Sequence, residues 1–144
     1  MLLSNEVREN LYVYVQNKYN LFRKAIDENK VLPMGQYSDA YTEYLKLDNF
    51  ILHENGRALV VAEFRFIDRD SYHNKSGLDT LSTTIHIEVG NNCYLYKEFN
   101  AQVDDIIKSK DTYVGYVEQY AVDIIKNAEI IGSSLLELSS SLKK

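Results

Sequence analysis

The sequence predicts an α+β protein with an N-terminal helix, a four-stranded antiparallel meander sheet, and a long C-terminal helix packed on one sheet face. Apolar residues recur at helical spacing near the N-terminus, alternate with polar ones from about 45 to 99, and follow a heptad spacing from Val103 onward. Strands followed by a helix are typical of the α+β class. The 144 residues suit one domain, so residues 1–144 are predicted to form a single domain.

The first element predicted is a helix over residues 5–29. Its apolar residues fall on one stripe, with charged residues on the other side, and the stripe consists of Val7, Leu11, Tyr14, Val15, Phe22, Ala25 and Ile26. Pro33 and Gly35 then indicate a loop. Residues 39–46 fit either a short helix or a strand, and the pattern does not decide between the two.

A β-hairpin is predicted around Asn55-Gly56, which separates two alternating runs, 47–54 and 57–67. Asn-Gly is the preferred filling of a two-residue type I′ turn, because both central residues need a positive φ. That turn fixes the register, and three opposed pairs then form the core face: Ile51 with Val60, Leu47 with Phe64, and Leu45 with Phe66.

Two more strands are predicted over 81–89 and 93–99, joined by a turn at 90–92. In the first of them Leu81, Thr83, Ile85, Ile87 and Val89 share one face, so His86 on the other face is expected to point to solvent. Tyr94 and Tyr96 are expected in the core, and Cys93 is expected to be a buried or half-buried structural thiol.

The C-terminal helix is predicted to begin at Asn100 and to run almost to the end. A continuous helix over 100–142 would measure about 64 Å, which exceeds the diameter of a compact domain of this size. The helix therefore either breaks, near Lys110–Thr112 or near Gly115, or packs against another chain. Packing against another chain would form a homodimer through a stripe of apolar residues: Ile125, Ala128, Ile131, Leu135 and Leu138. The alternative is that the N-terminal helix covers this stripe.

The charge and the N-terminal sequence limit where the protein acts. The chain carries 16 Lys+Arg against 21 Asp+Glu, a net charge of −5, and no basic run precedes Lys143-Lys144, which argues against nucleic-acid binding. The first six residues lack the pattern of a secretory signal, and no apolar run reaches the length of a membrane span. We therefore expect a cytoplasmic protein that does not enter a membrane.

No recognised cofactor or metal motif occurs in the sequence. Neither glycine-rich phosphate-binding pattern is present, and no two of the three histidines have helical spacing. A single cysteine excludes an internal disulfide and a multi-cysteine metal site. The prediction is that the chain binds no cofactor and no metal.

One constellation favours catalysis. The predicted register places Asp48 opposite Glu63, with Arg65 two residues further on, and this arrangement resembles the metal-binding core of the PD-(D/E)xK nucleases. The resemblance covers about twenty residues and implies a Mg²⁺-dependent nuclease. The chain departs from that pattern because arginine replaces the lysine, no proline precedes Asp48, and the helix after the third strand is missing.

The leading functional prediction is a non-catalytic protein that binds another protein, as inhibitors, immunity proteins, adaptors and phage accessory proteins do. The 12 tyrosines support it, since aromatic residues are enriched at interfaces. An acidic chain suits a basic enzyme as partner. The predicted contact residues lie outside the hairpins: Tyr37, Tyr41, Tyr44, Tyr72 and His73. A third possibility is a protein that sequesters a small ligand between sheet and helix.

Overall fold

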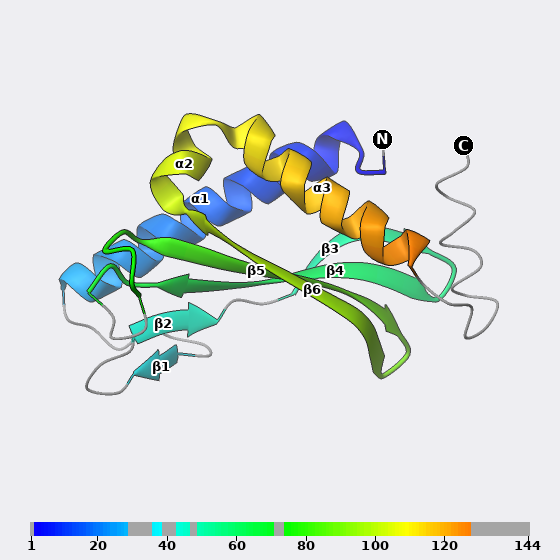
Figure 1. Ribbon diagram of the computed structural model, residues 1–144, viewed down its shortest axis with the longest axis horizontal. Helices are drawn as coiled ribbons and strands as arrows, with labels where there is room; N and C mark the ends of the chain where they lie inside the picture. Colours follow the sequence, from blue (N-terminus) through cyan, green and yellow to red (C-terminus); the bar gives the residue numbers. More distant parts are fainter. Residues whose placement is uncertain (1, 29–35, 39–42, 47–48, 71–73, 128–144) are drawn as a thin grey trace.

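The computed structural model describes residues 2–28, 36–38, 43–46, 49–70 and 74–127, with side chains for 2–28, 49–70 and 74–127. Helices and sheet form two layers (Figure 1). The elements in chain order are α1 (Asn5–Asp27), β1 (Gln36–Ser38), β2 (Glu43–Lys46), β3 (Phe50–Asn55), β4 (Ala58–Ile67), β5 (Thr80–Val89), β6 (Asn92–Gln102), α2 (Val103–Lys108) and α3 (Lys110–Lys126). The predicted α+β class is confirmed, with an N-terminal helix, an antiparallel meander and C-terminal helices packed against the sheet.

The meander consists of β3, β4, β5 and β6, and two short strands extend the sheet. β5 pairs with the whole length of β4 on one edge, so β2 and β3 share the other edge, and β1 pairs with β2. Of the two alternatives left open for residues 39–46, the strand is confirmed for residues 43–46. The pairing of Leu45 with Phe66 is also confirmed.

The β3–β4 turn differs from the predicted one. Its central residues are Gly56 and Arg57, because Asn55 pairs with Ala58. Gly56 has a φ of 61°, whereas Arg57 is not among the residues with positive φ, which fits a type II′ turn and not type I′. The predicted register is therefore wrong in β3, and His53, not Ile51, lies opposite Val60.

A β-bulge at Leu52 changes which β3 residues enter the core. The register shifts between Ile51 and His53, so that Leu52 is buried while Ile51 is 50% exposed. A bulge adds one residue to a strand and reverses the alternation of faces beyond it. The prediction that Ile51 is a core residue was wrong for this reason.

A second bulge lies in β6. The register between β5 and β6 shifts after Ile85, and Leu95 adopts a φ of 60°, which is the left-handed region. Tyr94 stays against the core, but Tyr96 is 62% exposed, so the predicted core role of Tyr96 was wrong. β6 also continues to Gln102, and Asn100 is a strand residue instead of the predicted helix cap.

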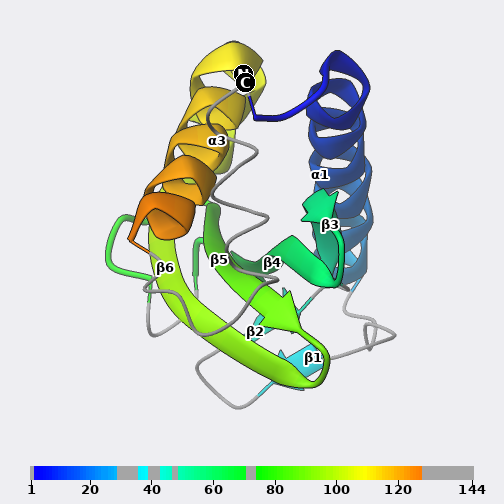
Figure 2. The ribbon, with the colours of Figure 1, turned by 90° about the vertical axis from the view of Figure 1, so that its right-hand side faces the viewer.

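The core lies between one face of the sheet and the two long helices (Figure 2). α1 begins at the cap Ser4, whose side-chain oxygen accepts a hydrogen bond from the Val7 backbone N–H. Its predicted apolar stripe is confirmed, and Phe22 stacks on Phe66 of β4. On β5, Leu81, Thr83, Ile85 and Ile87 all face this core, as predicted.

The C-terminal helix breaks at Ser109, between α2 and α3. This confirms the break expected near Lys110–Thr112, whereas Gly115, the other predicted break point, lies inside α3. Within α3, Tyr113 faces the sheet and its hydroxyl lies 2.8 Å from Thr83 Oγ1. Glu118, on a neighbouring face, bonds to Arg8 of α1 at 2.8 Å.

Two neighbouring faces of α3 therefore pack within the chain over its described residues. Ile125 is 0% exposed and belongs to the protein's own core, so its predicted role in a dimer interface was wrong. The other predicted interface residues, Ala128, Ile131, Leu135 and Leu138, lie outside the described residues. The physical reason is that Ile125 lies on the side of α3 that packs into the core of the chain.

Candidate functional site on the uncovered face of the sheet

The structure describes two of the five predicted contact residues, and only by their backbone. Tyr37 of β1 and Tyr44 of β2 are register partners at the edge of the sheet. Tyr41, Tyr72 and His73 lie outside the described residues. All five stay predictions as contact residues.

Of the nuclease-like constellation, Glu63 and Arg65 lie two residues apart on β4, and Arg65 pairs with Lys46 of β2. Asp48 lies outside the described residues. The flanking registers join Lys46 to Arg65 and Phe50 to Ala62, and they differ from each other by one residue. This ladder is not the regular one on which the pairing of Asp48 with Glu63 was predicted.

A different cluster forms on the sheet face that the helices do not cover. His86 and Glu88 lie two residues apart on β5, and Cys93 on β6 is the register partner of Glu88. His86 Nε2 is 2.9 Å from Glu88 Oε1, and Cys93 Sγ is 4.0 Å from the same oxygen. One potential ligand atom from each residue lies within 4.8 Å of the other two.

His86 is 0% exposed, so the prediction that it points to solvent was wrong. The bulge at Leu95 brings the Tyr96 ring over it, with 5.2 Å between the ring centroids. Its Nδ1 atom is buried and has no hydrogen-bond partner among the described residues. Native proteins pair nearly all buried polar atoms, so this unpaired ring nitrogen is unusual, as is the buried Nε2 of His53.

Two further side chains surround the cluster. Asn49 Nδ2 donates a hydrogen bond of 3.3 Å to Glu88 Oε1. A hydrogen bond with the Cys93 sulfur raises the pKa of the Tyr96 hydroxyl, and the charges of Glu63 and Glu88 act in the same direction. Cys93 itself is exposed, which corrects the predicted buried thiol; it lies on the uncovered face because its partner Glu88 does.

Sequence reasoning missed this cluster, although a signal for it was present. Gly90, with a φ of 61°, forms a two-residue turn with Asn91 between Val89 and Asn92. That turn places residue 88 opposite residue 93, and alternation along the strand puts residue 86 on the same face as residue 88. The burial of His86 had no such signal, since it depends on the bulge at Leu95.

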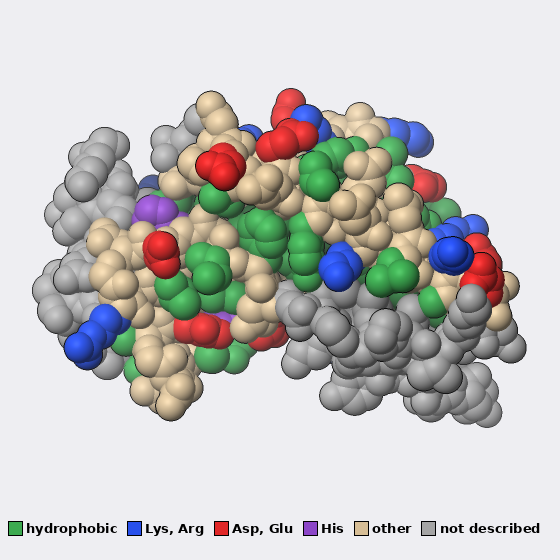
Figure 3. Space-filling view, turned by 180° about the vertical axis from the view of Figure 1, so that it is seen from behind, with side chains coloured by type: hydrophobic (Ala, Val, Ile, Leu, Met, Phe, Trp, Pro, Cys, Tyr) green, Lys and Arg blue, Asp and Glu red, His purple; other side chains and the backbone are tan. Residues whose placement is uncertain are grey.

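Exposed apolar side chains border the cluster. One cross-strand row contains Ile51, Val61 and His86 in β3, β4 and β5, with the bulged pair Leu95 and Tyr96 beside His86 in β6. The inner residues of this row are buried, whereas the outer ones are exposed: Ile51 by 50%, Leu95 by 38% and Tyr96 by 62%. Hydrophobic and acidic side chains lie close together over the hairpin ends of the sheet (Figure 3).

A second polar cluster, at the other end of β5, is fully paired. Asp79 is 6% exposed and accepts hydrogen bonds from the Tyr19 hydroxyl at 2.6 Å, from Arg23, and from the backbone and side chain of Arg69. Arg23 also bonds to Asp68 at 2.6 Å. Burial opposes ionisation of Asp79, but the hydrogen bonds and the charge of Arg23 outweigh it and lower the pKa to about 2. This cluster fixes the 68–79 loop to α1.

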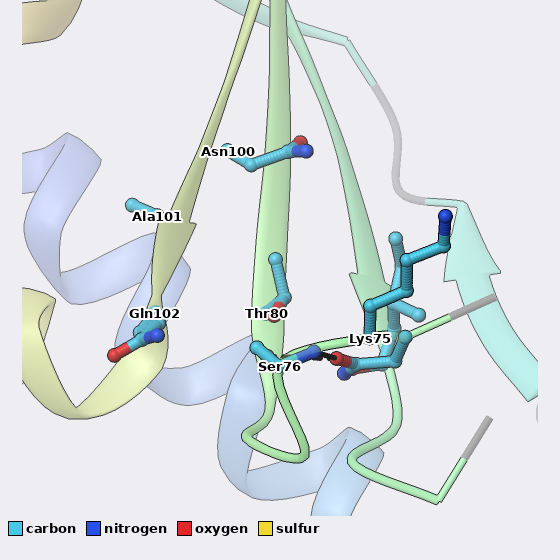
Figure 4. Close-up of a pocket in the computed structure, with 8 residues that line it drawn as sticks. Lys75, Ser76, Thr80, Asn100, Ala101 and Gln102 are labelled. Carbon is cyan, nitrogen blue, oxygen red and sulfur yellow. Dashed lines mark hydrogen bonds between the residues drawn. The ribbon is translucent and has the colours of Figure 1, made fainter.

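Two hollows occur at the surface of the described residues. One, of about 350 Å³, lies at the ends of β4, β5 and β6, with Lys75 on one side and Ala101 and Gln102 on the other (Figure 4). Asn74 at its edge is already bonded to the backbone carbonyls of Asp68 and Leu78. The other, of about 570 Å³, lies between the end of β6 and α2–α3.

Comparisons with protein-family models, with curated proteins and with solved structures give no match. Among the described residues, no helix is both long and apolar enough to cross a membrane.

Proposed function

We propose that the protein is a non-catalytic, cytoplasmic protein that binds another protein through the uncovered face of its sheet. The observation that carries the proposal is the row of exposed Ile51, Leu95 and Tyr96 on a face that neither helix covers. Exposed apolar side chains gathered on one face favour contact with a partner, and tyrosine is enriched in such contacts. The proposal includes inhibitors, immunity proteins and adaptors.

The charge of the same face favours a basic partner. Pairing along the strands places four carboxylates on this face: Glu54, Glu63, Glu88 and Glu98. Among the described residues of β3 to β6 on the same face, only Arg65 is basic. The whole chain has a net charge of −5. Complementary charge accelerates encounter and selects the partner, so a basic enzyme suits this face.

The test is affinity capture from the native host with two variants of this face, Ile51→Asp and Tyr96→Ser. Each has a matched control on the helix side, because Ile107 is 48% exposed and Tyr116 is 56% exposed. We expect the wild type, Ile107→Asp and Tyr116→Ser to recover the same basic protein, and the two sheet-face variants to lose it. In a direct titration with that protein, a rising salt concentration should weaken binding.

Three outcomes would contradict the proposal. The first is recovery of no partner in repeated captures, and the second is equal recovery by wild type and both sheet-face variants. The third is loss of the partner only with the helix-side controls, which would move the interface to α2 and α3. Variants at Tyr37 and Tyr44 test the edge of the sheet in the same assay.

Self-association through residues 128–138 stays a prediction. Light scattering at tens of micromolar measures it, and Ile131→Asp should convert a dimer into a monomer. A monomeric wild type would refute the predicted homodimer without affecting the proposal for the sheet face.

A further inference from the structure

We propose that His86, Glu88 and Cys93 form a binding site for a zinc ion, with one coordination position left open. The site is independent of the proposed function, because a protein interface on this face does not require a metal. Its basis is the juxtaposition of three side chains of metal-ligating types on two adjacent strands, with one potential ligand atom from each within 4.8 Å of the other two.

The backbone holds the three residues on one face. His86 and Glu88 alternate along β5, and direct pairing of Glu88 with Cys93 across the ladder fixes the third residue. Sites built on strands are held more precisely than sites on loops. The tight turn at Gly90 and Asn91 further limits relative movement of residues 88 and 93.

The distances are those of a site that needs only small side-chain movements to close. Ligand atoms at zinc-bond lengths from a tetrahedral ion lie roughly 3.3–3.7 Å from each other. The observed separations from Glu88 Oε1 bracket this range, at 2.9 Å to His86 Nε2 and 4.0 Å to Cys93 Sγ. A metal between the three atoms would replace the direct hydrogen bond between His86 and Glu88.

The chemistry of the three ligands selects the metal class. Magnesium and calcium prefer sites made of oxygen atoms, whereas a set with one nitrogen, one sulfur and one oxygen suits zinc and related transition metals. A thiolate and a carboxylate would together balance the charge of Zn²⁺, so the occupied site would carry no net charge beside the buried imidazole. Three protein ligands leave the fourth tetrahedral position for water or a ligand.

The surroundings also suit a metal. Asn49 donates to Glu88 Oε1 and orients the carboxylate, and the Tyr96 ring covers His86. Outer groups of this kind orient metal ligands. The His86 ring makes a single hydrogen bond, through Nε2, because Nδ1 has no partner among the described residues. Metal binding at Nε2 therefore costs this ring only that one hydrogen bond.

The experiment uses the full chain after chelator treatment and titrates it with Co²⁺, followed by Zn²⁺ as competitor. We expect one equivalent of Co²⁺ to produce a thiolate-to-metal charge-transfer band and the visible bands of a four-coordinate ion, and Zn²⁺ to abolish both. Cobalt reports ligand type directly, so the readout does not depend on any activity.

Three variants test the ligands, and each has a matched control. Cys93→Ser should abolish the charge-transfer band, and Glu88→Gln and His86→Asn should each weaken zinc binding at least about tenfold, as loss of a ligand does. Glu98→Gln, a carboxylate of the same face, and His53→Asn, a histidine outside the cluster, should bind as the wild type does. Cys93 is exposed, so Cys93→Ser keeps the test valid if His86→Asn fails to fold.

Two results would overturn the inference. One is a wild type that binds zinc no more tightly than about 0.1 mM, which is the strength of incidental surface contacts and corresponds to under about 6 kcal/mol. The other is stoichiometric binding that Cys93→Ser and Glu88→Gln leave unchanged, which would place the metal elsewhere in the chain.

Discussion

The two ends of β5 carry polar clusters of opposite character. At the start of the strand, Asp79 is buried and both of its carboxylate oxygens accept several hydrogen bonds from Tyr19, Arg23 and Arg69. Near the end of the strand, His86 is equally buried, but only one of its ring nitrogens has a partner among the described residues. The first cluster joins three separate segments of the chain, whereas the second joins two strands that already pair.

The comparison separates a structural role from a binding role. A cluster whose polar atoms are all paired has no capacity left for a ligand, and removing one member leaves buried charge without compensation. A cluster with an exposed thiol and three ligand atoms within 4.8 Å of one another retains that capacity and contributes little to folding. Stability variants should therefore act through Asp79, and ligand variants through Cys93.

The largest effect is expected from Asp79→Asn. It removes the charge that pairs with two arginines in a buried position, and loss of one partner of a buried ion pair costs roughly 3–5 kcal/mol. Urea unfolding monitored by circular dichroism measures this loss. Asp27→Asn is the matched control, because Asp27 also bonds to Arg23 but is 61% exposed, and its loss should be much smaller. Equal losses in the two variants would contradict the structural role of Asp79.

Acid should remove the same interaction gradually. The folded pKa of Asp79, about 2, lies below its ordinary value of 3.8, so its contribution is present above pH 4 and is lost as the pH falls from 4 to 2. The lost free energy of unfolding is about 2 kcal/mol. Denaturant unfolding at several pH values should show this dependence in the wild type and a flatter one in Asp79→Asn. Identical profiles would place the acid sensitivity elsewhere.

A smaller effect is expected between α3 and the sheet. Thr83 and Tyr113 share a hydrogen bond of 2.8 Å in the core, and both residues are buried. Tyr113→Phe leaves the threonine hydroxyl unpaired and should cost about 1–2 kcal/mol. Adding Thr83→Val to that variant should recover part of the loss, which a thermal unfolding double-mutant cycle measures. Additive losses would show that the two hydroxyls are not coupled.

The smallest effect has the opposite sign. Leu95 holds a φ of 60° at the β6 bulge, which costs a leucine roughly 1 kcal/mol relative to glycine. Leu95→Gly should therefore leave stability unchanged or raise it by up to about 1 kcal/mol, while it weakens partner binding. Leu95→Ala, which keeps the strain and loses most of the apolar surface, is the control. Destabilisation by Leu95→Gly alone would indicate that the leucine stabilises the fold itself.

The sequence predicted the elements of the fold because periodicity records which side chains must be buried. The stripe of α1 and the alternation of β5 both proved correct. The length of an unbroken helix limited the prediction to a break or to packing against another chain, and the structure shows the break at Ser109. These features depend on local spacing and on the size of a compact domain, and both can be read from one chain.

The candidate site could not be predicted in the same way because two bulges determine it. The bulges at Leu52 and Leu95 shift the registers by single residues, so that Ile51 and Tyr96 leave the core and become exposed. Neither bulge contains a glycine or proline that would have indicated it. The burial of His86 under Tyr96 follows from the second bulge. Because the sequence did not indicate that bulge, His86 was expected to point to solvent.

The most direct test of the difference between the two clusters is thermal unfolding with and without Zn²⁺, in the wild type, Cys93→Ser and Asp79→Asn. A ligand that binds only the folded state at 100 times its Kd stabilises it by about 2.7 kcal/mol. We predict the same zinc-dependent rise in Tm for the wild type and for Asp79→Asn, which starts from a lower Tm, and no rise for Cys93→Ser. An equal rise in Cys93→Ser, or none in the wild type, would contradict the account.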